Sequence, residues 1–267
     1  MILLLDIGNT HTHLGLGNDH RVGRAGRIPT AAWIDGTAAP LLARFVGRAK
    51  IHAAILCSVV PRATPRAVQC VQNTWQIPCP ALTSTTVRGI GIDYPQPGSI
   101  GPDRLANAVA ARHHFGAPAV VVDFGTAVTF YVLNRRGDYV GGIIAPGLAA
   151  MTDYLHEKTA LLPRIRIREP RATIGRNTEQ AMLAGAVYGY RGLVRELIGR
   201  LKRELNARRL PVVATGGCAR LLAKGMPEIT RVVPNLTIEG LRLVQKAHAL
   251  EPVNALESHC LNPDTPR

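Results

Sequence analysis

Two short stretches of apolar and polar residues, one opening the chain and one in its middle, follow the same pattern. In Leu3–Gly8 and in Val120–Gly125, three apolar residues precede an aspartate, and a glycine stands two places after it. Apolar runs of this kind indicate buried strands, and the glycine lets the backbone turn sharply. A third such strand and turn is predicted at Val212–Gly217, where two adjacent glycines allow a flat ligand to approach closely.

The turns after these strands have the chemistry of a phosphate site. Exposed backbone N–H groups in a tight turn form a concave anion site, and an aspartate at a strand tip can hold a cation or orient a water molecule. Recurrence of the pattern after two similar strands is a stronger signal than one Asp-x-Gly. The three turns therefore predict a nucleotide held between two halves of the molecule.

In the first half, periodicity predicts a sheet covered by helices. Residues 1–20 have the pattern of a hairpin, 37–49 of a helix, 53–60 of another buried strand, and 65–75 of a second helix. This alternation after an opening hairpin favours a mixed sheet flanked by helices.

The second half is predicted to begin near Ala117 with a comparable order of elements. A hairpin is expected over 128–144, followed by helices at 148–160, 178–206 and 238–250. A further short helix is expected after the Thr-Gly-Gly turn. The segment 164–168 alternates arginine and isoleucine as a half-buried strand does, so its arginines are predicted to form a solvated face rather than a phosphate-binding stripe.

A loop rich in glycine and proline, residues 88–104, joins the two halves. Loops between lobes are common places for binding and catalysis. Asp103 and Arg104 end it at the start of a helical pattern, where the helix dipole favours anions. Helix capping by Asp103 and a catalytic role for it are both open from spacing, and the two are compatible.

Composition indicates a globular protein. The chain has 267 residues, 46% of them hydrophobic, and a mean hydropathy of +0.08. No apolar run approaches the roughly 20 residues that span a bilayer, and the Met1–Leu5 run lacks a basic leader, so we expect a cytoplasmic protein without membrane contact. The cysteines show no metal or redox spacing and are expected to be free thiols: Cys57, Cys70, Cys79, Cys218 and Cys260.

The net charge of +14 invites a nucleic-acid hypothesis, which the distribution of charge argues against. Only five of the 32 basic residues are lysines, and the arginines are scattered along the chain. With 4% aromatic residues there is little from which to build a base-stacking platform, so nucleic-acid binding is not expected. His11 and His13 share a strand face but lack acidic or cysteine neighbours, which favours packing over metal binding and leaves a ligand contact open.

Several motifs together resemble the type III pantothenate kinases, with order and spacing kept over nearly the whole chain. They are D-I-G-N-T at 6–10, S-V-V-P at 58–61, G-P-D-R at 101–104, D-F-G-T at 123–126, G-G-I-I-A-P-G at 141–147, N-T at 177–178, T-G-G at 215–217 and L-T-I-E-G-L at 236–241. That family is part of the acetate and sugar kinase, Hsc70 and actin superfamily. The resemblance implies an α/β fold of two duplicated ribonuclease-H-like lobes with mixed sheets flanked by helices, here residues 1–114 and 115–252, with a polar tail at 253–267.

The resemblance also implies an activity: ATP-dependent phosphorylation of pantothenate to 4'-phosphopantothenate, the first step of coenzyme A biosynthesis. Asp103 would be the general base, with Arg104 beside it steadying transferring charge. Asp123 would hold a monovalent cation, K⁺ or NH₄⁺, and Asp6 would meet the magnesium of MgATP. Residues implied in ATP binding are Asp6, Ile7, Gly8, Asn9, Thr10, His11, Thr12, His13, Thr126, Gly216 and Gly217. Those implied in pantothenate binding are Tyr94, Gly101, Pro102, Asp103, Arg104 and Thr178.

Two departures from the expected pattern keep alternatives open. Pro102 stands where the family more often has alanine, which should be tolerated because proline suits a first helical position. The basic charge leaves room for a regulator or nucleic-acid-associated protein on the same scaffold, and a kinase of another small substrate is a further alternative. Joint presence of Asp6, Asp103, Arg104 and Asp123 disfavours an inactive scaffold. In this family the substrate site lies near a dimer interface, so a homodimer is expected.

Overall fold

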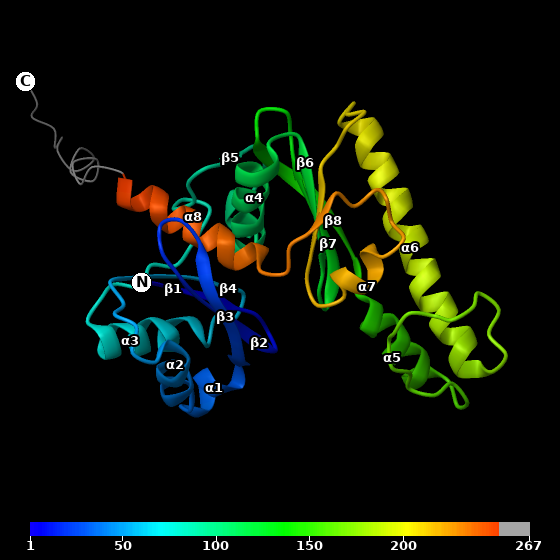
Figure 1. Ribbon diagram of the computed structural model, residues 1–267, viewed down its shortest axis with the longest axis horizontal. Coiled ribbons are helices and arrows are strands. Elements are labelled where there is room, and N and C mark those ends of the chain that lie inside the picture. The colour runs from blue at the N-terminus through cyan, green and yellow to red at the C-terminus, as the bar shows by residue number, and fades with distance from the viewer. Residues whose placement is uncertain (251–267) are drawn as a thin grey trace, which may run out of the picture.

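The computed structural model describes residues 1–250 and builds them around two mixed sheets (Figure 1). The first sheet has the order β3-β2-β1-β4, in which β1 runs antiparallel to β2 and parallel to β4. Its strands are β1 (Ile2–Ile7), β2 (His11–Gly17), β3 (Val22–Pro29) and β4 (Ala53–Ser58).

The second sheet has the order β10-β9-β6-β7-β8-β5. Its strands are β5 (Gly91–Ile92), β6 (Ala119–Phe124), β7 (Ala127–Leu133), β8 (Asp138–Pro146), β9 (Val212–Thr215) and β10 (Arg231–Val232). Strand β6 runs antiparallel to β7 and parallel to β9, as β1 does to β2 and β4. The order β8-β7-β6-β9 therefore repeats β3-β2-β1-β4, and the duplication predicted from the two aspartate turns is confirmed.

Helices separate and cover the two sheets, which gives the molecule five layers. On the outer face of the first sheet lie α1 (Ala31–Asp35), α2 (Ala38–Val46) and α3 (Thr64–Trp75). Between the sheets lie α4 (Pro102–Phe115) and α8 (Leu236–Leu250). The outer face of the second sheet carries α6 (Thr178–Glu204) and α7 (Ala219–Ala223), and α5 (Leu148–Lys158) packs against α6 and β7 (Figure 1).

This layering explains why β1 and β6 read as continuous apolar runs rather than alternating ones. Both strands are covered on both faces, so Leu3 and Leu5 pack towards the outer helices while Ile2 and Leu4 pack towards α4 and α8. Each run ends in a partly buried aspartate at the edge of the covered region. The sequence thereby sets an acidic side chain at the same point of both sheets.

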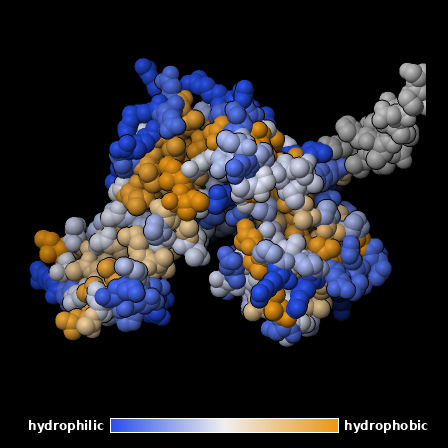
Figure 2. Space-filling view, turned by 180° about the vertical axis from the view of Figure 1, so that it is seen from behind, coloured by the Kyte–Doolittle hydropathy of each residue, from blue (hydrophilic) through white to orange (hydrophobic). Residues whose placement is uncertain are grey.

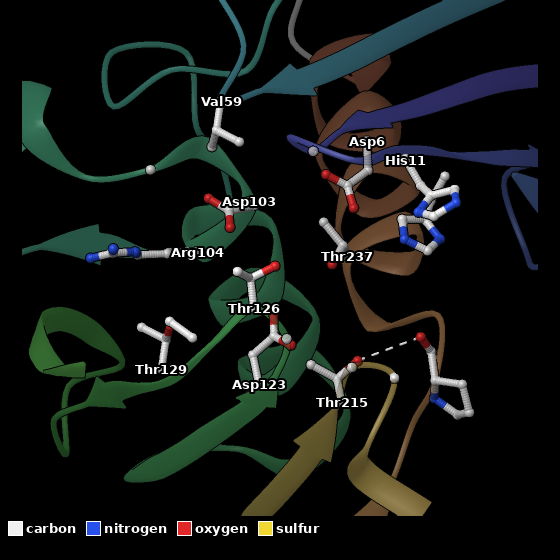
Figure 3. Close-up of a pocket in the computed structure, with 18 of the residues that line it drawn as sticks. Asp6, His11, Val59, Asp103, Arg104, Asp123, Thr126, Thr129, Thr215 and Thr237 are labelled. Carbon is white, nitrogen blue, oxygen red and sulfur yellow. Dashed lines mark hydrogen bonds between the residues drawn. The ribbon is translucent and has the colours of Figure 1, made fainter. Parts of the chain in front are cut away.

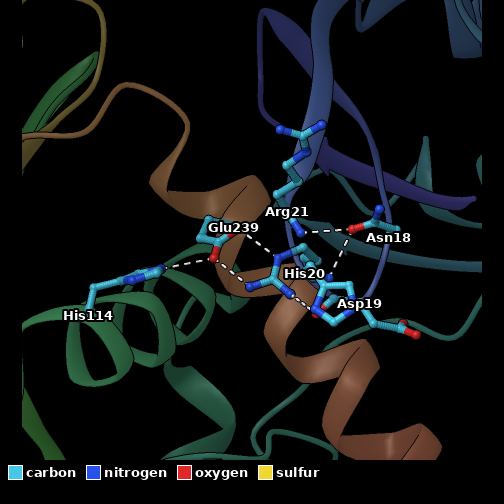
Figure 4. Close-up of polar contacts among 7 residues, drawn as sticks. Asn18, Asp19, His20, Arg21, His114 and Glu239 are labelled. Carbon is cyan, nitrogen blue, oxygen red and sulfur yellow. Dashed lines mark hydrogen bonds and ion pairs between the residues drawn. The ribbon is translucent and has the colours of Figure 1, made fainter.

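The two middle helices cross at close range. A Cβ atom added to Gly240 would lie 1.9 Å from the carbonyl oxygen of Ala106, so only glycine lets α8 approach α4 this closely. Nearby, the buried Arg242 donates to Glu239 and to the carbonyl oxygen of Asp19, and His114 lies 2.9 Å from the same glutamate (Figure 4). These contacts tie α8 to α4 and to the β2–β3 turn.

The division into lobes at residue 114 stays a prediction, because α8 follows the second sheet in sequence but also packs on the first. The last two residues of the predicted second lobe, 251 and 252, and the predicted tail 253–267 lie outside the described residues, as does Cys260. The other four cysteines are free, Cys57 and Cys79 being buried. No helix within residues 1–250 is both long and apolar enough to cross a bilayer.

The strand predicted at 164–168 was wrong, and the structure adds detail at two other places. Segment 164–168 is not a strand because no neighbouring strand pairs with it, although Ile165 is buried and the arginines are exposed as predicted. Asp103 does not cap α4: Gly101 occupies the N-cap position, without a side-chain hydrogen bond. The loop 88–104 is not wholly irregular, since β5 within it pairs with β8 and a 3-10 turn, η1, covers Pro97–Ser99.

Candidate active site

A cleft of about 800 Å³ lies where β1, β6 and β9 end, between the two sheets (Figure 3). The first-sheet wall carries Asp6 and the turn after it, and the second-sheet wall carries Asp123 and the Thr215–Gly217 turn. The first turn of α4 supplies Asp103 and Arg104, which enter the cleft from the middle layer. The three predicted turns thus meet at one cavity, as the repeated pattern indicated.

Three carboxyl groups face this cavity, and each has a raised pKa. Burial, with the Asp103 and Asp123 carboxyls as further causes, raises the pKa of Asp6 to about 7. Burial and the charge of Asp103 raise the pKa of Asp123 to about 6, and burial raises the pKa of Asp103 against opposing contributions from Arg104. Keeping several buried carboxyl groups close together costs free energy when no cation is bound, and this cost falls when cations neutralise their charge.

Each of the two strand-end aspartates has one side-chain hydrogen-bond donor. The thiol of Cys57 donates to Oδ1 of Asp6 over 3.3 Å, and the hydroxyl of Tyr131 donates to Oδ2 of Asp123 over 3.2 Å. Oδ1 of Asp103 is buried and has no hydrogen-bond partner among residues 1–250. A buried acceptor without a partner is uncommon and costly, which makes Asp103 a candidate for a functional role.

The Thr215–Gly217 turn lies very close to the end of β6, which explains why glycine occupies position 216. Gly216 has a φ of +91°, and a Cβ there would lie 2.4 Å from Oδ1 of Asp123. The backbone of the turn therefore approaches the Asp123 carboxyl more closely than any residue with a side chain would allow.

Most of the predicted site residues line this cleft. Asp103 and Asp6 lie at one end of it and Asp123 with Thr126 further along (Figure 3). Those lining it are Asp6, Gly8, Asn9, Thr10, His11, His13, Gly101, Asp103, Arg104, Asp123, Thr126, Gly216 and Gly217.

Two residues of the predicted nucleotide segment face away from the cleft. Ile7 is fully buried in the outer core of the first lobe. Thr12 is also buried, and its hydroxyl is bonded to Thr30 and accepts from the Trp33 ring N–H. Alternation along β1 and β2 causes this, so any contact of these two residues with ATP must come from the backbone.

Three predicted substrate residues also lie outside the lining of the cleft. Tyr94 follows β5 and meets Tyr139 edge to face, with ring centroids 6.0 Å apart. Pro102 is the first residue of α4, and Thr178 is the exposed first residue of α6, after the N-cap Asn177. The family resemblance implied that these residues bind pantothenate, and within this chain Thr178 does not line the cleft that contains Asp103.

The cleft also contains residues that the motifs did not indicate. Tyr131 and Thr129 project from β7 because alternate residues of that strand face the cavity. That alternation was readable in the sequence. Three others are contributed by α7 and by the segment from β10 to α8, whose course only the fold reveals: Arg220, Val232 and Asn235.

Comparison with known proteins identifies the family. The model of the type III pantothenate kinase family matches residues 2–200. The chain belongs to the type III pantothenate kinase family. It is 46% identical to the type III pantothenate kinase of Akkermansia muciniphila over 241 residues, which covers 90% of this chain and 96% of the relative. Identity to the type III pantothenate kinase of Methylacidiphilum infernorum is 42%, over 91% and 87% of the two chains.

Solved structures show the same fold at low identity. A Campylobacter jejuni protein described as a Baf family transcriptional activator matches with a TM-score of 0.60 and 19% identity, over 92% of this chain and 98% of that one. A Sinorhizobium meliloti protein described as a 2-dehydro-3-deoxygalactonokinase matches with a TM-score of 0.59 and 14% identity, over 95% and 100%. These likenesses establish the sugar-kinase and actin-like architecture.

As a type III pantothenate kinase, the protein phosphorylates pantothenate with ATP and Mg²⁺ at the start of coenzyme A biosynthesis. The described residues contain no cluster of three His, Cys, Asp or Glu side chains that could hold a metal ion by themselves. The carboxyls of the cleft, with their raised pKa values, nevertheless suit a cation that takes its remaining ligands from phosphate oxygens.

Proposed function

We propose that Asp103 is the general base of pantothenate phosphorylation. The observation that carries this proposal is the position of the Asp103 side chain in the lining of the cleft, at the first turn of α4, with its Oδ1 buried and without a hydrogen-bond partner among residues 1–250. There it can accept the proton of the primary hydroxyl of pantothenate as that oxygen attacks the γ-phosphorus and the bond to ADP breaks. A carboxylate suits this step, since phosphoryl transfer needs positioning and charge neutralisation more than covalent help.

Other residues of the cleft supply charge and position. Arg104 would stabilise the charge that spreads over the transferring phosphoryl group. The turn Gly8–Thr10 and Thr126, on opposite walls, would bind the phosphates of ATP, and Asp6 would meet its magnesium. Magnesium would neutralise the charge of the phosphates, and Asp6 with the neighbouring carboxyls of the cleft would hold it.

Asp123 is the residue we propose for a monovalent cation, K⁺ or NH₄⁺. Its carboxyl is buried beside the Gly216 turn and holds one hydrogen bond, from Tyr131. Burial and, after it, the charge of Asp103 raise the pKa of Asp123, and a bound cation would offset both effects.

For pantothenate we propose contacts with Tyr94, Gly101 and Arg104, completed by Thr178 of a second copy in a homodimer. Thr178 is exposed and does not line the cleft of its own chain. The protein is expected to work in the cytoplasm, where ATP is available.

The Asp103→Asn variant tests the general base. It should lower kcat about 100-fold or more while leaving the affinity for ATP nearly unchanged, because the amide keeps the shape but cannot take a proton. Asp35→Asn, at an exposed site on the first lobe, is the control and should behave like wild type. Near-normal turnover by the Asp103 variant would refute the assignment.

Release of ADP with and without pantothenate, in potassium and then in sodium buffer, tests the cation site. We expect pantothenate-dependent turnover that is faster in potassium, and Asp123→Asn should abolish that difference by removing the charge that holds the ion. Equal rates in the two salts for the wild-type protein would contradict a potassium site.

A further inference from the structure

We propose that Arg220 and Asn235 form the base-binding end of the nucleotide cleft and that Asn235 contributes to the preference for adenine. This inference rests on the proposed placement of ATP between the two lobes. Neither residue belongs to the motifs that the sequence singled out, and they come from different elements, α7 and the segment leading into α8.

The two ends of the cleft differ in chemistry. Asp6 and Asp103 lie together at one end, and Thr215 lies at the other, where its hydroxyl reaches the carbonyl oxygen of Pro234 (Figure 3). Pro234, bonded to Thr215, is followed by Asn235, and Val232 pairs beside Ala214 at the end of β9. Arg220 is in α7, which follows the Thr215–Gly217 turn, and all four residues line the cleft. An apolar wall with a few polar groups suits a flat heterocycle, whereas the end with Asp6 and Asp103 suits magnesium and phosphates. The carboxyl of Asp123 lies beside the Gly216 turn, close to Thr215.

Both polar side chains lack a bonding partner within the described part of the protein. Within residues 1–250 neither the Arg220 guanidinium nor the Asn235 amide makes a side-chain hydrogen bond or ion pair. Other arginines of this lobe are paired: Arg191 with Glu169, and Arg195 with Glu228. The groups at the base end are therefore free to bind a ligand without first breaking a bond inside the protein.

The backbone that carries Arg220 is held firmly. The buried Arg191 donates from Nε to the carbonyl oxygen of Leu222 over 3.2 Å and from Nη2 to that of Leu221 over 2.7 Å. It also forms a two-pronged pair with Glu169, at 2.9 and 2.8 Å. Short helix α7 is thereby anchored to α6, and Arg220 is presented from a fixed position.

The chemistry of the two groups points to a purine. A guanidinium is planar and stacks on aromatic faces. An asparagine amide matches the adjacent donor and acceptor on one edge of adenine, while the same edge of guanine offers two acceptors. Stacking by Arg220 would thus hold any purine, and Asn235 would discriminate between adenine and guanine.

Calorimetric titration separates binding of the base from binding of the phosphates. The probes are a non-hydrolysable ATP analogue and inorganic tripolyphosphate, each with magnesium. Arg220→Ala should weaken the analogue roughly fivefold, and Arg220→Lys by less, while affinity for tripolyphosphate stays within about twofold of wild type. Arg208→Ala, which removes an equal charge from an exposed site of the same lobe, should change neither.

Two results would overturn the inference for Arg220: an unchanged affinity for the analogue, or an equal loss for tripolyphosphate, which would make Arg220 a phosphate ligand. For Asn235, the Asn235→Ala variant should lower the ratio of affinities for the ATP and GTP analogues, and an unchanged ratio would remove its proposed role. Because titration needs no turnover, these outcomes are independent of whether Asp103 is the base.

Discussion

At the scale of single residues, the buried carboxyl groups of the cleft lower the stability of the ligand-free protein, and bound cations would offset this loss. Asp6 has a pKa of about 7 in the folded protein against an ordinary value of 3.8. Between these values the unfolded chain releases the proton while the folded chain keeps it. Stability of the ligand-free protein should therefore fall as pH rises from about 4 to about 7.

Replacing Asp6 with asparagine tests this cost. Without nucleotide or divalent cations, Asp6→Asn should melt at least about 3 °C above wild type at pH 8, and the two should converge near pH 4, where both carry a neutral group. Thermal unfolding followed by circular dichroism from pH 4 to 8 measures the difference. A difference in melting temperature that stays constant at every pH would show that packing rather than charge is responsible.

At the scale of elements, the crossing of α4 and α8 positions the first turn of α4 and hence Asp103. Gly240→Ala would place a methyl group within 1.9 Å of the Ala106 carbonyl oxygen, so the helices must separate. We expect a loss of about 2 kcal/mol in the free energy of unfolding and a lower kcat. Urea denaturation and steady-state kinetics measure the two effects.

The matched control for this crossing is Gly192→Ala on α6, where a Cβ would meet nothing within 4 Å. Alanine there should stabilise the protein by about 0.5 to 1 kcal/mol, because glycine is the poorer helix former. If both variants gave the same change in stability, the close approach of α4 and α8 would not be a constraint.

Elements that depend on local pattern were predicted from the sequence, and those that depend on partners were not. Strands β1 and β6 and long helix α6 have strong periodicity or long apolar runs, and they form as expected. Strand β3 is largely polar and exists because it pairs with β2, so no apolar run indicates it. The strand wrongly predicted at 164–168 has the same cause, since alternation of polar and apolar residues does not make a strand without a neighbouring strand to pair with.

The site divides along the same line. Asp6, Asp103 and Asp123 belong to motifs that can be recognised in the sequence, and all three line the cleft. Thr12 was included among the ATP-binding residues that the resemblance implied, but its side chain points into the core because of strand alternation. Arg220 and Asn235 could not be found, because only the fold brings α7 and the start of α8 to the same end of the cavity.

At the scale of the whole molecule, the second lobe has exposed apolar side chains that a single copy leaves uncovered. Tyr154 on α5 is 61% exposed, and Leu161 and Ile174, in the segment after it, are 89% and 83% exposed. Figure 2 shows apolar side chains at this tip of the molecule. Thr178, which the family resemblance assigns to pantothenate, begins α6 in the same part of the chain.

A homodimer formed through this surface would cover the apolar side chains and bring Thr178 towards the cleft of the other copy. We therefore expect that the double variant Tyr154→Asp with Leu161→Asp sediments as a monomer, because burying two carboxylates in an interface is costly. Its KM for pantothenate should rise about tenfold or more through loss of the Thr178 contact, while affinity for the ATP analogue should stay unchanged.

The control for the dimer is Ile34→Asp, which changes an apolar side chain that is 44% exposed on the opposite lobe. It should leave both sedimentation and KM as in wild type. Sedimentation velocity combined with kinetics separates the two parts of the proposal. A monomeric double variant with a normal KM would show that Thr178 is not part of the substrate site, since a contact supplied by the partner cannot survive separation of the two copies. A wild-type protein that is monomeric at micromolar concentration would refute the dimer itself.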